Sequence, residues 1–422
     1  MNGHLHKMSL FLVLVSLSLV AAAQQGAHVY RIVIKGGHVI DAKNNINELM
    51  DIAIQDGKIA RVAKNIDTAL AAQTVNARGM FVTPGLIDIH AHVFYGFEPD
   101  HYLSNGTVAV LPDQSTFKSG VTTVVDAGGA GWKSFPLFKK NIIDNSQTRV
   151  LSLLNIVGEG MRGIDPYEQN LNDMDAKLTA EAAVANKQHV VGFKVAHFTG
   201  SDWTPIQRGV EAGKMANMPV MIDLNSIYFS LEELFTKYLR PGDIYTHTFI
   251  ESTRGVVDPI VDLKTRQFKP FVLQAQKKGI IFDVGFGGGS FNFRQALPAT
   301  KAGFYPNTIS TDLHKGSVNG AMKDQLNVLS VFLAMGMKLP DAIKASTWTP
   351  AQVIRREELG NLSVGSEADI AVLSVRKGVF GFRDVGGNKL TGTQKLECEL
   401  TMRAGKIVYD LNAISSNINV TR

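Results

Sequence analysis

The middle of the chain repeats one pattern, in which a short apolar run ends in polar or ionisable residues and a helical stretch separates most runs from the next. Eight such runs lie between residues 81 and 314, among them VTTVVDAG, HVVGFKVAHF and TISTDLH. Helical stretches such as DAKLTAEAAVANKQ and PIQRGVEAGKMANM lie between them. Eight alternating strands and helices predict an α/β fold, a (β/α)8 TIM barrel, with a doubly wound open sheet as the alternative.

The polar residues lie at one end of these runs. In chain order they are His90 and His92, Asp126, Asn155, Lys194 and His197, Asp223, His247, Asp283, and Asp312. In a barrel the carboxyl ends of the strands converge on the active-site face, so these side chains should share one site. His90 and His92 stand at i and i+2, which places both on one face of a strand, where two imidazoles can bind one metal ion. The convergence favours a metal site over a pair of surface histidines on an edge strand.

Both ends of the chain carry short β-like segments with hairpin signals. These signals are Gly36-Gly37, Asp56-Gly57 and, near the C-terminus, Ala404-Gly405. We expect the two ends to build one small β-sandwich from residues 24–81 and 362–422, around a barrel that spans residues 82–361. Two independent end caps are the alternative.

Residues 1–23 have the pattern of a secretory signal peptide. Lys7 precedes the apolar stretch MSLFLVLVSLSLVAAA, which ends in Ala21-x-Ala23. The stretch is short for a membrane span, and an N-terminal membrane anchor is the alternative. No second long apolar segment follows. We therefore expect an exported protein, periplasmic or extracellular, without a membrane span once the signal is removed.

Composition narrows the chemistry of the predicted site. The net charge of the whole chain is only +5 and no basic tract is interleaved with aromatic residues, so nothing in the sequence indicates a nucleic-acid partner. Cys398 is the sole cysteine, which excludes an intramolecular disulfide and a thiolate metal cluster. Any metal must therefore be bound through histidine, aspartate, glutamate or lysine.

Four motifs together resemble the amidohydrolase superfamily of metal-dependent hydrolases: PGLIDIHAH, GFKVAH, YTHTF and STDLH. The stretches VTTVVDAGGAGW, FDVGFGGGSF and ISTDLH are most similar to its amidohydrolase/deacetylase branch, of the dihydroorotase and D-aminoacylase kind. The resemblance covers roughly residues 29–412. It implies a hydrolase of C–N bonds other than peptide bonds, or of esters, in which a metal-bridged hydroxide attacks the carbonyl of a small molecule such as an N-acyl amino acid or a cyclic amide.

The resemblance also implies a role for each polar strand end. His90 and His92 would bind the first of two divalent metal ions, zinc or manganese, and His247 the second. Asp312 would bind the first ion and accept a proton from water as the catalytic residue, although a helix N-cap is the alternative for it. Lys194 would bridge both ions after carboxylation by carbon dioxide, because a free ammonium group is a poor ligand.

Two residues depart from the family pattern. Asp223 stands where most binuclear members carry a histidine, and we expect it to bind metal through oxygen, which suits harder ions such as Mn²⁺. An ion pair between Lys194 and Asp223 or Asp312 is the alternative for these residues. Phe286 stands where the branch carries histidine, so substrate choice should differ.

Loops on the same face supply candidate substrate contacts. These candidates are Tyr95, Asn155, His197, His314 and Asn319. The alternative for His197 is a metal ligand that replaces the histidine missing from strand five. Two rival functions stay open. A mononuclear, deaminase-like hydrolase would not need Lys194, and a metal-free binding protein would need none of the ligands. Assembly into a homo-oligomer is a family-level expectation only.

Overall fold

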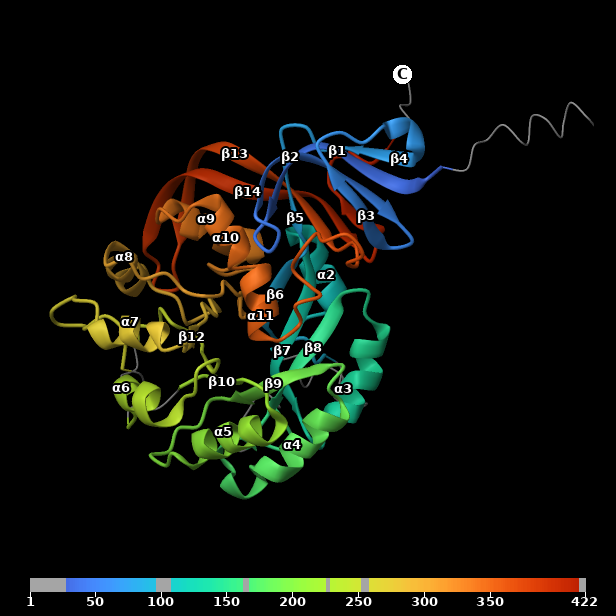
Figure 1. Ribbon diagram of the computed structural model, residues 1–422. Helices are drawn as coiled ribbons and strands as arrows, with labels where there is room; N and C mark the ends of the chain where they lie inside the picture. The colour runs from blue at the N-terminus through green and yellow to red at the C-terminus, as the bar shows by residue number, and fades with distance from the viewer. Residues whose placement is uncertain (1–27, 96–107, 162–166, 225–227, 252–257, 417–422) are drawn as a thin grey trace, which may run out of the picture.

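The computed structural model describes residues 28–95, 108–161, 167–224, 228–251 and 258–416, so the predicted signal segment lies outside the described residues. Seven parallel strands follow one another in chain order around a curled sheet (Figure 1). They are β6 (Leu86–Ala91), β7 (Val121–Gly131), β8 (Arg149–Asn155), β9 (Val190–Val195), β10 (Val220–Ile222), β11 (Ile244–Tyr245) and β12 (Ile281–Phe282).

The eighth position of the ring is filled by an irregular segment, residues 308–313. Thr308 makes a parallel bridge to Asp283 after β12, and Leu313 makes one to Ala91 at the end of β6. The N–H of His92 donates to the carbonyl of Leu313 at 2.8 Å. The segment therefore joins the last strand to the first, and the predicted barrel of eight positions is confirmed.

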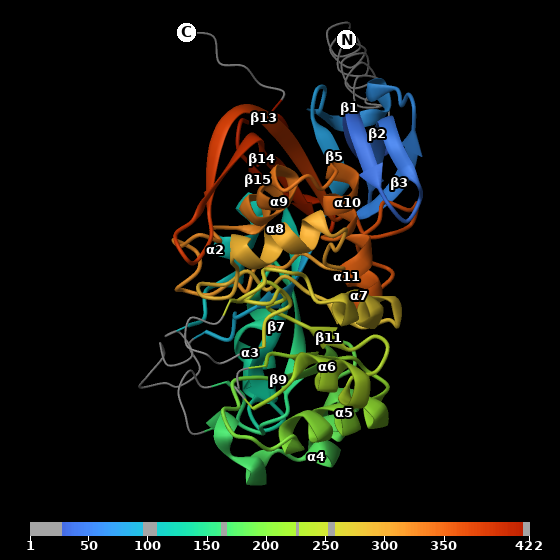
Figure 2. The same cartoon turned by 90° about the vertical axis from the view of Figure 1, so that its left-hand side faces the viewer.

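Helices cover the outside of the ring (Figure 2). The predicted helices at 175–188 and 205–218 are confirmed as α4 and α5. Asp175 caps α4 by accepting the N–H of Leu178 at 2.9 Å. The α-helices after the first barrel strand are α2 (Pro112–Thr116), α3 (Phe135–Asn141), α4 (Ala176–Ala185), α5 (Thr204–Ala216), α6 (Leu231–Glu233), α7 (Pro270–Lys277), α8 (Phe293–Lys301), α9 (Gln325–Ala334), α10 (Leu339–Lys344) and α11 (Trp348–Val353). No helix in the described ranges has the length and apolar character needed to cross a membrane.

Both ends of the chain form one mixed sheet of eight strands, so they build one β domain together, as the sequence predicted, and not two independent end caps. Its order is β15-β14-β13-β5-β1-β2-β3, with β4 paired to β1. The two ends meet where β13 runs antiparallel to β5, and Figures 1 and 2 both show the blue and red strands together at one end of the molecule. The strands are β1 (Tyr30–Asp41), β2 (Ile46–Gln55), β3 (Lys58–Ala63), β4 (Ala71–Asn76), β5 (Phe81–Pro84), β13 (Ile370–Arg383), β14 (Lys389–Arg403) and β15 (Lys406–Asp410).

One predicted hairpin turn is wrong. Gly36-Gly37 lies inside β1 as a bulge, and the chain turns only after Asp41. A β-carbon on Gly37 would lie 2.4 Å from Cγ2 of Val82, so glycine is needed here for close approach to β5. The bulge marks where β1 changes partner from β4 to β5 on that side. The turn at Asp56-Gly57 is confirmed between β2 and β3, and that at Ala404-Gly405 between β14 and β15.

A charged network fastens the small sheet to the barrel. Arg149, the first residue of β8, donates to Asp369 Oδ2 at 2.6 Å and to Glu367 Oε2 at 2.7 Å. Arg403, the last residue of β14, binds the same two carboxylates from the other side. These contacts hold the amino-terminal end of a barrel strand against the small sheet.

Candidate metal centre

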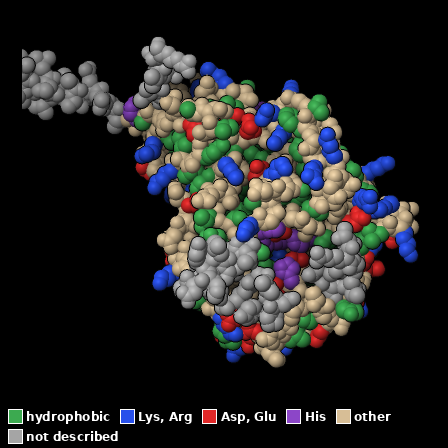
Figure 3. Space-filling model, turned by 180° about the vertical axis from the view of Figure 1, so that it is seen from behind, with side chains coloured by type: hydrophobic (Ala, Val, Ile, Leu, Met, Phe, Trp, Pro, Cys, Tyr) green, Lys and Arg blue, Asp and Glu red, His purple; other side chains and the backbone are tan. Residues whose placement is uncertain are grey.

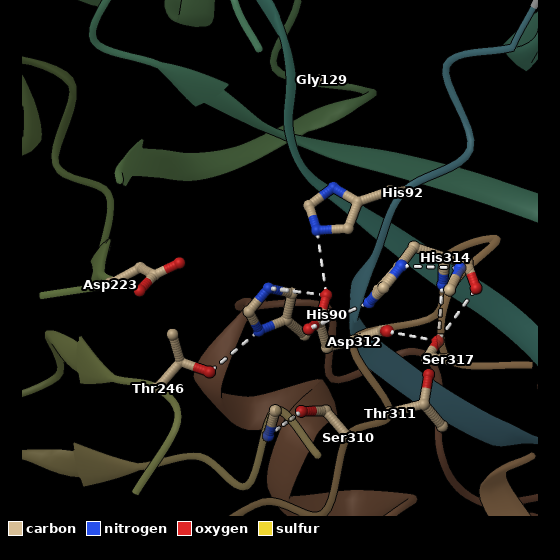
Figure 4. A network of polar contacts seen from close by, with 12 residues as sticks. His90, His92, Gly129, Asp223, Thr246, Ser310, Thr311, Asp312, His314 and Ser317 are labelled. Atoms are coloured by element: carbon tan, nitrogen blue, oxygen red, sulfur yellow. Dashed lines mark hydrogen bonds and ion pairs between the residues drawn. The ribbon is translucent and has the colours of Figure 1, made fainter. Parts of the chain in front are cut away.

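The end of β6 and the closing segment bring three ligand atoms together. His90, His92 and Asp312 form the one group of three such side chains, among the residues that the structure describes, whose ligand atoms all lie within 4.8 Å of one another. Asp312 Oδ1 lies 3.0 Å from His92 Nε2 and 3.6 Å from His90 Nε2. Figure 4 shows the three side chains close together. The structure thus unites the residues predicted to bind the first metal ion.

Lys194 lies fully buried beside this group, at the end of β9. Its Nζ is 3.1 Å from His90 Nε2 and 3.7 Å from Oδ2 of Asp223. Met221 Sδ, also at 3.7 Å, is a weak acceptor. The side chain therefore sits between the two predicted halves of the centre, and no carboxylate oxygen of the described residues is within 3.5 Å of its ammonium group.

Asp223 follows β10 and forms the centre of a second group. Its Oδ2 lies 3.3 Å from His247 Nε2 and 3.3 Å from His197 Nε2. Both Asp223 and His247 are 8 % exposed, while the His197 side chain is 42 % exposed. Figure 3 shows histidine side chains, with acidic side chains among them, at a hollow in this face.

Buried hydrogen bonds orient the histidine rings. His90 Nδ1 lies 2.8 Å from the hydroxyl of Thr246, which donates to Asp283 Oδ2 at 2.8 Å. Because that hydroxyl proton goes to Asp283, we infer that His90 Nδ1 carries a proton and that Nε2 keeps its lone pair. His247 Nδ1 likewise faces the carbonyl of Gly285 at 2.6 Å. Each ring therefore directs its Nε2 atom into the centre.

Three of the eleven non-glycine residues with a positive φ, among the described residues, lie at the same place. His197, His247 and Asp312 all have left-handed backbones, with φ of 55°, 55° and 51°. Non-glycine residues rarely adopt this conformation, and it clusters at functional sites. Gly287 has φ of 59°, and a β-carbon there would lie 2.2 Å from Asp312 Oδ2. The glycine run after β12 thus makes room for Asp312.

The charges of the donors suit a divalent metal ion. Burial, together with the Lys194 ammonium group, lowers the pKa of His90 to about 3, so its ring stays neutral and can offer a lone pair. Burial opposes ionisation of Asp312, but the histidine side chains around it together outweigh burial and hold the pKa of the carboxyl well below its usual value. Nδ1 of His92 is buried and has no hydrogen-bond partner among the described residues. Two imidazoles and a carboxylate form a typical set for zinc or a similar ion, so these residues fit the metal.

Residues 286–408 match the sequence profile of the Amidohydrolase family. A deacetylase of Agrobacterium fabrum is 32% identical over 327 residues, which make up 76% of this chain and 77% of that protein. This chain belongs to the amidohydrolase family. It is a metal-dependent hydrolase of C–N bonds other than peptide bonds, which removes the metal-free binding protein as a rival function.

Other relatives cover similar lengths of this amidohydrolase. A deacetylase of Brucella anthropi is 31% identical over 328 residues, or 76% of this chain and 78% of that protein. The crystal structure of an adenine deaminase is 28% identical with a TM-score of 0.81, covering 90% of this chain and 100% of that chain. A dihydroorotase structure is 28% identical with a TM-score of 0.79, covering 90% and 99%. The fold is therefore shared by relatives whose names indicate different reactions.

The predicted substrate contacts of the amidohydrolase lie in different settings. His314 is partly buried, with Nε2 3.8 Å from Asp312 Oδ2, and Tyr95 is partly buried after β6. Asn319 is exposed. Asn155 is 1 % exposed, and its amide donates to the carbonyl of Gly128 at 3.2 Å, so it braces the strand ends. The assignment of all of them to substrate stays a prediction.

Phe286 packs inside the hydrophobic core. Its ring is fully buried and stacks on Phe291, with centroids 4.2 Å apart and planes at 10°. The ring packs in the main hydrophobic core of the molecule. Any influence of Phe286 on substrate choice must therefore act through packing, because the side chain is fully buried.

Several supporting residues escaped the sequence analysis. Asp88 accepts the N–H of His90 at 3.2 Å and binds Thr311, and burial raises the pKa of its carboxyl to about 7. The strand alternation that placed His90 and His92 on one face also placed Asp88 there, so this signal was available. Thr246 and Glu168 had no such signal, because their partners are set by packing between distant segments.

Proposed function

We propose that this amidohydrolase cleaves the amide bond of a small N-acyl compound, such as an N-acyl amino acid, at a centre of two divalent metal ions. The observation that carries the proposal is the convergence of His90, His92 and Asp312 beside the buried Lys194. Deacetylases at 31% and 32% identity support the acyl amide as substrate. The dihydroorotase structure at 28% identity favours a cyclic amide as the second candidate.

In this proposal the ligands divide into two sets. His90, His92 and Asp312 hold the first ion, and Asp223 and His247 hold the second. When bound, divalent metal lowers the pKa of water and polarises a carbonyl oxygen. Lys194 joins the two sets, since its Nζ lies 3.1 Å from His90 Nε2 and 3.7 Å from Asp223 Oδ2.

The setting of Lys194 supports its carboxylation. A fully buried ammonium group needs an anion at hydrogen-bond distance, and here the nearest described carboxylate oxygen is 3.7 Å away. A carbamate on Nζ would be anionic. Its two oxygen atoms could serve as ligands for the two proposed metal ions. Lys194→Ala should therefore lose metal, and acetate or propionate added during metal loading should restore part of it.

Asp312 is positioned to move the proton of the reaction. Its Oδ1 faces His92 and His90, while Oδ2 points to the side of His314 at 3.8 Å. As a carboxylate at this position, Asp312 can accept a proton from the attacking water and return it to the leaving nitrogen. In this proposal one carboxylate performs both proton transfers of the amide hydrolysis, first from the water and then to the leaving nitrogen.

Metal content per chain tests the proposal. The protein is prepared with bicarbonate and mixed divalent metals, as wild type, Asp223→Ala and the control Asp67→Ala, which removes an exposed carboxylate of the small domain. We expect about two metals in the wild type and control and about one in Asp223→Ala. The wild type is then assayed with N-acetyl amino acids, cyclic amides and adenine.

Each outcome selects one reading. Two metals with turnover of acyl amino acids support the proposal, and turnover of cyclic amides supports the second candidate. One metal in the wild type, with turnover of adenine, would favour the mononuclear rival and make Lys194 an ion-pair residue. Two metals in Asp223→Ala would exclude Asp223 as a ligand.

We also propose that the protein is exported, on the pattern of residues 1–23. The mature chain should begin after Ala23. Mass spectrometry of the protein from periplasmic and culture fractions checks this, with a Lys7→Glu variant as the comparison. An intact N-terminus on cytosolic protein would contradict the proposal.

A further inference from the structure

The His197 ring is held at both of its nitrogen atoms. Nδ1 lies 2.7 Å from Glu168 Oε2, and Nε2 lies 3.3 Å from Asp223 Oδ2. The other oxygen of Glu168 accepts the amide of Asn155 at 3.1 Å. Asn155, Glu168 and His197 therefore form one row of polar contacts that ends on the carboxylate of Asp223.

Within the described part of the chain, Asp223 lacks the kind of donors that orient the neighbouring carboxylates. Asp126 accepts backbone N–H groups and Asp283 accepts hydroxyl groups, at 2.6–3.3 Å. Among the described residues, no backbone N–H or hydroxyl donates to Asp223. Its contacts are His247 and Lys194 on the side of the metal centre and His197 on the other.

The geometry argues against His197 as a further ligand of the same ion. Its Nε2 and that of His247 both lie 3.3 Å from Asp223 Oδ2. Yet among the described residues these three side chains do not form a group with all ligand atoms within 4.8 Å of one another. The two nitrogens thus approach Asp223 from different sides, and His197 is placed to orient the carboxylate from outside.

A short helical turn fixes His197 in this position. The turn, η5 (Tyr167–Gln169), supplies Glu168 to the ring, and Gln169 Nε2 donates to the carbonyl of His197 at 2.7 Å. Gln169 Oε1 accepts the N–H and the hydroxyl of Thr199, both at 3.0 Å. The left-handed backbone of His197 is thereby held by the element that anchors its side chain.

We propose that Glu168 and His197 are positioning residues that hold Asp223 as a ligand of the second metal ion. A short aspartate in place of a histidine needs an outer partner to fix its oxygens, and the Glu168–His197 pair supplies one. Outer partners of this kind typically contribute 10–100-fold to metal affinity. The inference rests on the proposed function, in which Asp223 binds metal.

The test measures the affinity of each metal ion by competition with a chelator, in the full-length protein. In His197→Ala and Glu168→Gln we expect the second ion to bind roughly 10–100-fold more weakly and the first ion to bind as in wild type. The double variant should be no weaker than His197→Ala, because the two residues act in series. His189→Gln, at the opposite end of β9, is the matched control and should leave both affinities unchanged.

Thermal unfolding of the metal-free variants separates positioning from a general loss of structure, since only the latter lowers their midpoint. Unchanged affinity for the second ion in His197→Ala, with a raised KM, would overturn the inference, leave the two-metal centre intact and make His197 a substrate contact. A wild type that binds one ion only would overturn both the inference and the proposed centre.

Discussion

Gly287 packs directly against the carboxylate of Asp312. A β-carbon there would lie 2.2 Å from Asp312 Oδ2, and the backbone φ of 59° is itself unfavourable for a side chain. Gly287→Ala should displace Asp312 and lower kcat roughly 100-fold, the cost typical of a 1 Å misplacement. Steady-state kinetics and metal content check this.

Gly289→Ala is the control for that substitution, because its β-carbon would meet no heavy atom within 4 Å. It should keep at least half of the wild-type kcat. Equal losses in both variants would mean that the loop as a whole, and not the approach to Asp312, sets the rate.

At the scale of residues, the sequence located the polar strand ends that meet at the centre better than the residues that support them. His90, His92, Lys194, Asp223, His247 and Asp312 each follow an apolar run, and convergence of strand ends is a general rule of barrels. Glu168 follows no such run, and it reaches His197 only because η5 folds back across the strand ends. A contact between two loops produces no periodic pattern in the sequence from which it could be predicted.

At the scale of elements, Arg149 links β8 to the small sheet through its hydrogen bonds to Asp369 and Glu367. Arg149→Ala would remove two hydrogen bonds to Asp369 and Glu367, while Arg403 still faces both carboxylates. We expect the free energy of unfolding to fall by about 2–3 kcal/mol, somewhat less than for a fully buried pair that loses its only partner. Urea unfolding followed by circular dichroism measures this.

Arg376→Ala is the matched control, since Arg376 pairs with Glu397 at 3.3 Å on the exposed face of the β13–β14 hairpin. An exposed pair contributes about 0–1 kcal/mol. Similar losses in the two variants would contradict the role of Arg149 as a link.

At the scale of elements, the barrel strands and the long helices were predictable and two features of the small sheet were not. Alternation located the first part of β13 and the last part of β14, but the strands continue to Arg383 and begin at Lys389 through exposed, glycine-containing sequence. Gly36-Gly37 has the composition of a turn and forms a bulge, because a neighbouring strand, absent from the local sequence, decides its conformation.

The whole molecule should gain stability from its metal ions. Among the described residues, the group of His90, His92 and Asp312 joins the end of β6 to the closing segment, and the proposed second set follows β9, β10 and β11, so the centre exists only in the folded ring. A metal ion that binds only the native state raises the free energy of unfolding by about 4 kcal/mol when its free concentration is 1,000 times its Kd. Removal of metal with EDTA should therefore lower the thermal midpoint, and added zinc or manganese should restore it, as calorimetry can show. EDTA already saturated with metal is the control, and an unchanged midpoint after true removal would contradict this.

The closing segment also sets an order of events in time. His90 and Asp312 are separated by about 220 residues, so at a synthesis rate of roughly 5–20 residues per second one leaves the ribosome some 10–45 s before the other. The same segment that carries Asp312 completes the ring, so capture of the ion waits for the last strand position to dock. Because metal binding is coupled to folding, we expect the first ion to bind only after the closing segment has docked.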